Sequence, residues 1–331
     1  MSAFNDEKVF ISVIIPVYNG EKFIRQCLDS IITSSKQCCN LKIEIIVIND
    51  GSTDCSKEIT EIYEKQNDNI ILVNKKNGGV SSARNMGVER SQGRFLVFVD
   101  IDDFVGVEFF QEIKNTLRNK ADFYLFDEVY YGDKNENYTK ISRDIRGGMN
   151  KDFTYYDRCL IFQKLNVVWD KIFIRDLIIE NGIRFDEERN IGEDLKFVLD
   201  YSKHIQNYYI SKTLPYYYRK NINGTGKSKI SHISDCEKNY YMLMQYAKER
   251  KVEQKYINNI NCRFIGLLFN IAGNLYGQKV SKNIIYNNLV HSKAYKYLIS
   301  IDYKDPSTQI KRWLLKNKLY SVINFLARMD K

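Results

Sequence analysis

Four short apolar runs that alternate with helix-like segments are the feature that most constrains how this chain folds. The runs cover residues 9–15, 43–48, 69–73 and 95–99 and are rich in Val and Ile, as is typical of strands buried on both faces of a sheet. The intervening segments 21–33, 56–65 and 80–91 read as helices. The alternation predicts right-handed crossovers and an α/β fold, in which a mostly parallel sheet is sandwiched by helices.

The pattern changes along the rest of the chain. After residue 104 we expect strands at 122–131 and 214–219, helices at 174–180 and 192–201, and a polar loop or hairpin at 132–150. From residue 234 only helices are predicted, at 234–251, 254–276, 281–293 and 309–328. We therefore expect an α/β domain at 9–225 and a basic helical domain at 233–331.

Polar residues follow each of the four predicted strands. They are Tyr18-Asn19, Asp50-Gly51-Ser52, Asn77-Gly78-Gly79 and Asp100–Asp103. Ligands of α/β proteins bind beyond the carboxyl ends of the strands. The topology therefore predicts a binding site at this edge of the sheet.

The carboxylates after the fourth strand, in Asp100-Ile101-Asp102-Asp103, suit a divalent cation. Without a cation, three neighbouring carboxylates would repel one another and resist desolvation. Mg²⁺ or Mn²⁺ prefers such hard oxygen ligands and shares its shell with phosphates. Alone, this DxD pattern is a weak signal, because acidic turns often follow strands.

Three further residues fit a nucleotide. Tyr18 offers a ring on which a base could stack, Asp50 can accept a hydrogen bond from a base N–H, and Arg84 can pair with a diphosphate. The alternatives are a core position for Tyr18 and a helix-capping role for Ser52, Thr53 or Asp54. Together with a metal site, the set predicts a nucleoside-diphosphate site.

Three segments resemble the GT-A (Rossmann-like) fold of the family 2 inverting glycosyltransferases. They are PVYNGEKFIRQCLDSI, IIVINDGSTDCS and NGGVSSARNMGVERSQGRFLVFVDIDD, and the resemblance is dense over residues 9–105. It implies transfer of a hexose or N-acetylhexosamine from a nucleotide-sugar, usually a UDP-sugar, with the help of Mn²⁺ or Mg²⁺. The implied acceptor is a hydroxyl group of a glycan or lipid-linked molecule in bacterial capsule, lipopolysaccharide or other envelope polysaccharide synthesis.

The resemblance also implies roles for individual residues. Those that match donor contacts are Pro16, Tyr18 and Asp50 at the base, and Asn77, Arg84 and Asp100 near the ribose and pyrophosphate. By the same comparison, Asp102 is the metal ligand, and Asp50 accepts from the uracil N3–H. Asp103 completes a DxDD pattern with a less settled role.

Later motifs extend the resemblance. Glu193-Asp194 resembles the family's catalytic pair, with Asp194 as the base; the alternative is that both only favour the first turn of a helix. Trp169-Asp170-Lys171 resembles a segment that lines the sugar and acceptor pocket. Arg219 resembles a cation that stabilises the departing nucleotide, whereas the SxxS spacing at 228–231 departs from the family, and His232 is a weak candidate metal ligand.

The excess positive charge lies in the last third of the chain. Residues 221–331 carry 19 Lys and Arg against 7 Asp and Glu, or +12, whereas residues 1–220 carry 31 against 34. Around residues 311–331 basic side chains flank an apolar set that includes Trp313, with Leu315, Leu319, Val322, Leu326 and Met329 on one predicted helical face. This pattern predicts peripheral contact with an anionic membrane; the alternatives are packing on the catalytic domain or homo-oligomerisation.

Other features bound the class of protein. The chain is 44% apolar and 13% aromatic, which excludes a disordered protein, and it has no apolar run long enough to cross a membrane. Seven Cys without a CxxC pair and an N-terminus without a signal pattern favour a cytoplasmic protein. Together with the basic C-terminal segment, the family resemblance implies peripheral binding to the inner face of the bacterial cytoplasmic membrane. Nucleic-acid binding is not expected. A non-catalytic glycan- or membrane-binding protein on a decayed fold and a nucleotidyltransferase stay open as alternatives.

Overall fold

The structure, a computed structural model, describes residues 11–38, 41–132, 137–161, 165–189, 191–219 and 233–329. These residues form two compact units. Unit 1 comprises the described residues of Met1–Phe153, Asn166–Glu188 and Glu193–Ile222. Unit 2 comprises those of Thr154–Leu165, Arg189–Gly192 and Asn223–Lys331.

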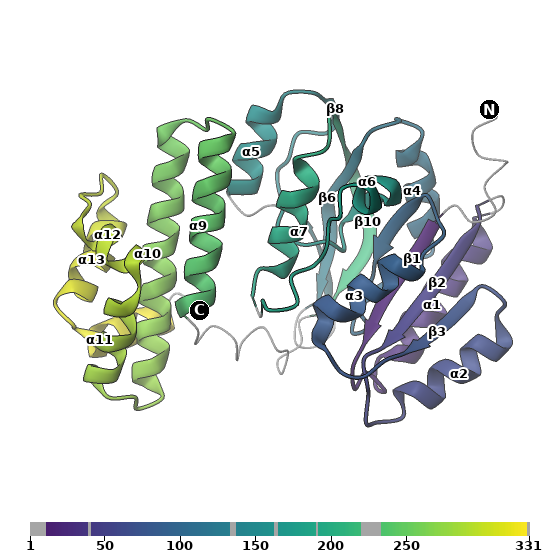
Figure 1. Cartoon of the computed structure of the whole chain (residues 1–331), viewed down its shortest axis with the longest axis horizontal. Helices are drawn as coiled ribbons and strands as arrows, with labels where there is room; N and C mark the ends of the chain where they lie inside the picture. The colour runs from purple at the N-terminus through teal and green to yellow at the C-terminus, as the bar shows by residue number, and fades with distance from the viewer. Residues whose placement is uncertain are drawn as a thin grey trace. The chain divides into compact units, whose positions relative to one another are not determined.

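The first half of the sheet in unit 1 is parallel (Figure 1). It runs β3 (Ile70–Asn74), β2 (Ile43–Asn49), β1 (Ile11–Val17) and β4 (Phe95–Phe98). Every residue of β1, β2 and β4 is buried, which explains why these strands are apolar apart from Ser12, Glu44 and Asn49. All four predicted strands are present, and β1 is hydrogen-bonded to both β2 and β4.

The second half of the sheet mixes strand directions. Antiparallel β9 (Lys171–Ile174) joins β4 to β6 (Phe123–Gly132), and β10 (Tyr208–Tyr218) then pairs parallel to β6 and antiparallel to β5 (Phe104–Val105). The predicted loop or hairpin contains β7 (Tyr138–Ser142), which pairs with β6, and β8 (Gly148–Asn150), which pairs with β10. The sheet is therefore parallel throughout from β3 to β4, around the predicted site, and mixed beyond β4.

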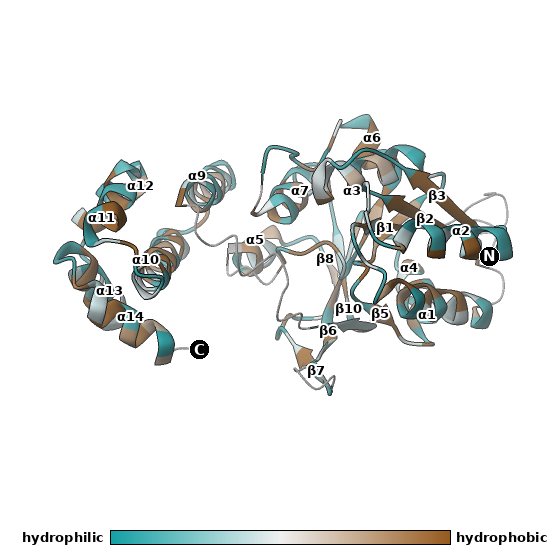
Figure 2. Ribbon diagram, turned by 90° about the horizontal axis from the view of Figure 1, so that it is seen from below, coloured by the Kyte–Doolittle hydropathy of each residue, from teal (hydrophilic) through white to brown (hydrophobic). Residues whose placement is uncertain are grey.

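Helices cover both faces of this sheet (Figure 2). Helices α1 (Ile24–Gln37), α2 (Ser56–Gln66) and α4 (Phe109–Leu117) bury their apolar sides in the core on one face. Helix α3 (Gly79–Arg90) packs against β1 and β2 on the other, where Gly87 meets Ile14 so closely that an added Cβ would clash with it. Helix α7 (Glu193–Ser202) buries Phe197 against Phe98 of β4. The short helix α6 (Arg175–Glu180) follows β9.

Unit 2 is helical. It contains α5 (Phe153–Ile161) except for its first residue, and then α9 (Ile233–Glu249), α10 (Gln254–Gly277), α11 (Lys282–His291), α12 (Lys293–Ser300), α13 (Pro306–Lys316) and α14 (Tyr320–Met329). Helix α10 packs against α9, α11, α12, α13 and α14. Tyr246 of α9 donates a hydrogen bond to Asp157 of α5 at 2.6 Å, which ties α5 to this unit.

Two helix predictions in unit 2 were wrong. The segment predicted as one helix at 309–328 is two helices, because the chain turns at Asn317–Leu319, where Lys318 has a left-handed φ of +56°. The predicted common apolar face is therefore also wrong: Leu315 is fully buried, whereas Met329 is 70% exposed. The segment predicted at 281–293 ends earlier, at His291, and α12 begins at Lys293.

Within the described ranges, no helix combines the length and apolar character needed to cross a membrane.

Candidate active site

The strand pairing brings the predicted polar segments to one edge of the sheet. Because β1 lies between β2 and β4 in parallel register, the three strands end side by side. The loops after β1 and β2 are linked directly: Asn19 N–H donates to Ser52 Oγ at 3.1 Å, and Thr53 N–H donates to Asn19 Oδ1 at 2.8 Å. The site is therefore built on loops that hydrogen-bond to each other.

The first strand supplies two of the predicted base contacts. Pro16 is buried within β1, and Tyr18, two residues later, leaves the core with 53% of its surface exposed. The alternative that Tyr18 is a core ring is therefore wrong. An exposed ring at the end of β1 is free to stack on a flat ligand.

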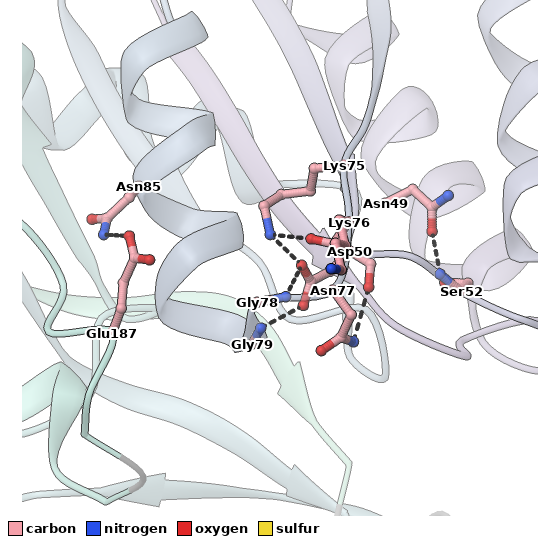
Figure 3. A network of polar contacts seen from close by, with 10 residues as sticks. All are labelled: Asn49, Asp50, Ser52, Lys75, Lys76, Asn77, Gly78, Gly79, Asn85 and Glu187. Carbon is pink, nitrogen blue, oxygen red and sulfur yellow. Dashed lines mark hydrogen bonds and ion pairs between the residues drawn. The ribbon is translucent and has the colours of Figure 1, made fainter.

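Asp50 is the centre of a dense polar network (Figure 3). Its carboxylate is buried and accepts hydrogen bonds from Lys75 Nζ at 2.5 Å and from the backbone N–H groups of Gly78 at 2.9 Å and Gly79 at 2.8 Å. Asn77 Nδ2 donates to the backbone oxygen of Asp50 at 2.9 Å. Asp50 thus shapes the turn into α3. Sequence reasoning missed Lys75, whose signal was its position directly after β3.

Arg84 joins two carboxylates that are far apart in the sequence. Its Nη2 lies 2.8 Å from Asp100 Oδ1, and its Nη1 lies 2.7 Å from Asp194 Oδ1. The guanidinium is buried on α3 and lies over the ring of Phe185. The neighbouring Asn85 donates to the backbone oxygen of Phe185 at 2.9 Å. It also donates to Glu187 Oε1 at 2.9 Å (Figure 3). Helix α3 therefore holds the end of β4 and the start of α7 together.

The electrostatic surroundings of Asp194 suit a general base. Burial raises the pKa of Asp194 to about 7, with Glu193 and Asp100 adding to the increase and Arg84 and Lys171 opposing it. A base whose pKa lies near the working pH takes up a proton efficiently and is still substantially ionised. Glu193 and Asp194 are the first two residues of α7, as predicted.

The carboxylates after β4 have three different environments. Asp100 pairs with Arg84. Asp103 is buried: one of its oxygens accepts from Tyr216 Oη and the other from the backbone N–H of Arg219, both at 2.7 Å. Burial raises the pKa of Asp103 well above its usual value. Asp102 is partly exposed.

The carboxylates after β4 could hold a cation only if a substrate supplied further ligands to it. Among the residues that the structure describes, no group of three or more His, Cys, Asp or Glu side chains could hold a metal ion. Mg²⁺ and Mn²⁺ are often bound by one or two carboxylates, with phosphate oxygens and water as the other ligands. Asp102 fits that arrangement. His232 and the 228–231 segment lie outside the described residues.

The residues of two later motifs are buried. Trp169 stacks on Tyr216 at 4.7 Å, and the buried Lys171 donates to its neighbour Asp170 at 2.5 Å. Asp170 also pairs with Arg143, which sequence reasoning missed. Arg219 donates from Nη2 to Gln26 Oε1 at 2.5 Å, and its guanidinium lies over the ring of Phe23.

Comparison with known proteins identifies the class. A family model described as glycosyl transferase family 2 matches residues 12–180, about half of the chain. The chain therefore belongs to glycosyltransferase family 2.

Individual relatives agree with this assignment. EpsJ of Bacillus subtilis, an uncharacterized glycosyltransferase, is 31% identical over 64% of this chain and 62% of its own length. A poly(ribitol-phosphate) beta-glucosyltransferase of Bacillus spizizenii is 28% identical over 71% of this chain and 36% of its own length. The chain spans less than two thirds of the length of the first curated relatives that it matches.

A solved structure confirms the predicted fold. Residues 1–349 of S. aureus TarS, crystallised with UDP-GlcNAc, align with 98% of this chain and 93% of their own, with a TM-score of 0.69 and 19% identity. At this identity the likeness establishes the fold alone, which is GT-A.

Proposed function

We propose that this chain is an inverting glycosyltransferase that moves a sugar from a UDP-sugar to a hydroxyl group of a glycan or lipid-linked acceptor. The observation that carries the proposal is the position of Arg84, which bridges Asp100 at the donor edge and Asp194, the candidate base. The relatives support the donor and the pathway: TarS was crystallised with UDP-GlcNAc, and one relative is named for the glucosylation of poly(ribitol phosphate). We infer transfer of a hexose or N-acetylhexosamine in bacterial envelope polysaccharide synthesis.

The proposed reaction uses one carboxylate, Asp194, at the acceptor and another, Asp102, at the diphosphate. Tyr18 stacks on the base, and Asp50 accepts its N–H. Asp194 takes the proton of the acceptor hydroxyl as that oxygen bonds to the anomeric carbon, and the bond to the diphosphate oxygen breaks on the opposite face, which inverts the configuration. Asp102 would hold Mn²⁺ or Mg²⁺ together with the diphosphate; when bound, such an ion offsets the charge of the departing nucleotide.

Replacing Asp102 with Asn tests this metal role. The amide removes the charge that the cation needs and keeps the shape of the side chain, so we expect UDP affinity to lose its dependence on Mn²⁺. Titration calorimetry with and without Mn²⁺ gives the result for the variant and the parent. A variant that keeps the full response to Mn²⁺ contradicts the assignment of Asp102.

A donor screen tests the proposed function as a whole. The chain is incubated with Mn²⁺ and a panel of UDP-, GDP-, CDP- and dTDP-sugars, and release of the free nucleotide is measured with polyol-phosphate and lipid-linked saccharide acceptors. We expect release from a UDP-sugar that increases with acceptor. Binding without release indicates a decayed fold, and formation of a nucleotide-sugar from a nucleoside triphosphate and a sugar phosphate indicates a nucleotidyltransferase.

We further propose peripheral contact with an anionic membrane through one surface of unit 2. This α13–α14 surface consists of the exposed apolar side chains of Ile310, Trp313, Val322, Phe325 and Met329. Opposite them, Leu315 and Ile323 are fully buried in unit 2, where α13 and α14 pack against α10. Residues 306–329 include five Lys and Arg and no Asp or Glu, which suits anionic headgroups.

Vesicle sedimentation tests this surface. The parent should bind vesicles that contain phosphatidylglycerol and should not bind pure phosphatidylcholine. Trp313→Ser combined with Phe325→Ser should weaken binding by about tenfold or more, because two large apolar groups no longer enter the interface. Ile284→Ser, at an equally exposed position on α11, serves as the control. Unchanged vesicle binding in the double variant, or a loss of self-association in its place, contradicts the membrane assignment.

A further inference from the structure

The unused hydrogen-bonding capacity of Asp50 and Lys75 points to how the site selects a base. Asp50 Oδ1 already accepts from Lys75 Nζ and Gly78 N–H, whereas within the described part of the chain Oδ2 accepts from Gly79 N–H alone. A carboxylate has about two acceptor positions on each oxygen. One position on Oδ2 is therefore open to a ligand.

Lys75 has a matching donor. Its ammonium group donates to Asp50 Oδ1 at 2.5 Å and to the backbone oxygen of Lys76 at 2.8 Å (Figure 3). An ammonium group has three protons, so one is available, with no further partner among the described residues. The Lys75 side chain is only 12% exposed, which keeps its charged end beside Asp50 and not free in solvent.

The open acceptor position on Asp50 and the available N–H group of Lys75 match the hydrogen-bonding edge of one class of nucleobase. Uracil presents N3–H as a donor next to O4 as an acceptor, which is the arrangement of any lactam base. Cytosine presents the reverse, an N3 lone pair next to an amino group. In the same position it would place its lone pair against the Asp50 carboxylate and its amino N–H against the Lys75 ammonium. Buried polar groups left without partners in this way strongly disfavour the wrong ligand.

We propose that Lys75 is a specificity-determining residue, which acts with Asp50 to select a nucleotide with a lactam base, such as uracil, over cytosine. This inference rests on the proposed function, because it takes the base to lie against Asp50. It adds a second contact that reads O4, and it gives the ion pair between Lys75 and Asp50 a role besides shaping the turn into α3.

Competition between nucleotides tests the proposal. For the parent chain with Mn²⁺, we expect UDP to bind about 100-fold more tightly than CDP, since two charge-assisted contacts are mispaired with cytosine. Lys75→Met should reduce this ratio to about tenfold or less, because only the Asp50 contact still discriminates. The nucleotide dTDP carries the same lactam edge, so its affinity should fall with the substitution as that of UDP does.

The chain offers a matched control. Lys76→Met removes the neighbouring lysine, whose side chain is exposed and which contributes only its backbone oxygen to the network. This variant should keep the parent ratio. Lys75→Gln, which retains a neutral donor, should give an intermediate ratio. It also serves as a second test of the proposal if Lys75→Met does not fold.

The possible outcomes separate the two proposals. If Lys75 only shaped the turn, its loss would weaken UDP and CDP equally and leave their ratio unchanged. An unchanged ratio with measurable UDP binding therefore overturns the role of Lys75 and leaves the proposed function intact. If the parent itself binds no UDP, the proposed function fails.

Discussion

Replacing Asp194 with Asn is expected to reduce sugar transfer by about a thousandfold while UDP affinity changes little. A positioned general base typically contributes a factor of about 10²–10⁴ to the rate. Asn is isosteric and can still accept a hydrogen bond from Arg84, whose Nη1 lies 2.7 Å from Asp194 Oδ1, so the geometry of the site should persist. Only the ability to take a proton is lost.

The measurement needs both rates and affinities. Initial rates of transfer and UDP titrations are compared for Asp194→Asn and for Asp200→Asn, which makes the same change on the same helix. Asp200 is paired there with Lys196 and Lys203. The control should retain transfer. Near-parent turnover by the Asp194 variant would exclude this residue as the base.

The second large effect is expected from Arg84→Met, which leaves two partly buried carboxylates without their shared cation. Removing one partner of a buried ion pair typically costs about 3–5 kcal/mol of folding free energy. The same change removes the group that opposes the rise in the pKa of Asp194. We therefore expect the pH at which transfer reaches half of its maximum to be higher in the variant than in the parent.

The pH dependence distinguishes this effect from a general loss of packing. An aspartate whose folded-state pKa lies above its unfolded value of 3.8 costs stability progressively as the pH rises through that window. With Arg84 removed, the window for Asp194 extends above about pH 7, so the stability deficit relative to the parent should grow as the pH rises above about 7. Urea unfolding at several pH values measures it. Arg84→Lys, which retains the charge, should recover much of the pH profile. A deficit independent of pH would contradict the electrostatic account.

Much of the fold near the site could be predicted because its strands are buried on both faces. Residues 43–48 read as a strand because every residue of β2 is buried and, apart from Glu44 and Asn49, apolar. The start of β10 was missed because Ser211, Lys212 and Thr213 interrupt the apolar pattern. The break between α13 and α14 was missed because it falls at Lys318 and not at a Gly or Pro, while the apolar spacing continues across it.

The candidate site could be predicted in its composition and less in its contacts. The strand-end positions of Tyr18, Asp50 and Asp100 follow from topology. The pairing of Arg84 with Asp194 joins residues that are 110 positions apart, a separation that carries no local signal. The burial of Asp103 depends on Tyr216, a residue of a different strand. Such long-range contacts become visible only when the whole sheet is assembled.

The structure of the full chain with UDP and Mn²⁺ bound is the most direct test of the central claim, that a nucleotide binds where β1, β2 and β4 end. The account predicts the base over Tyr18 with its N–H at Asp50, and the diphosphate and the ion at Asp102. A complex with the nucleotide at any other place, or crystals that bind neither UDP nor Mn²⁺, would contradict it.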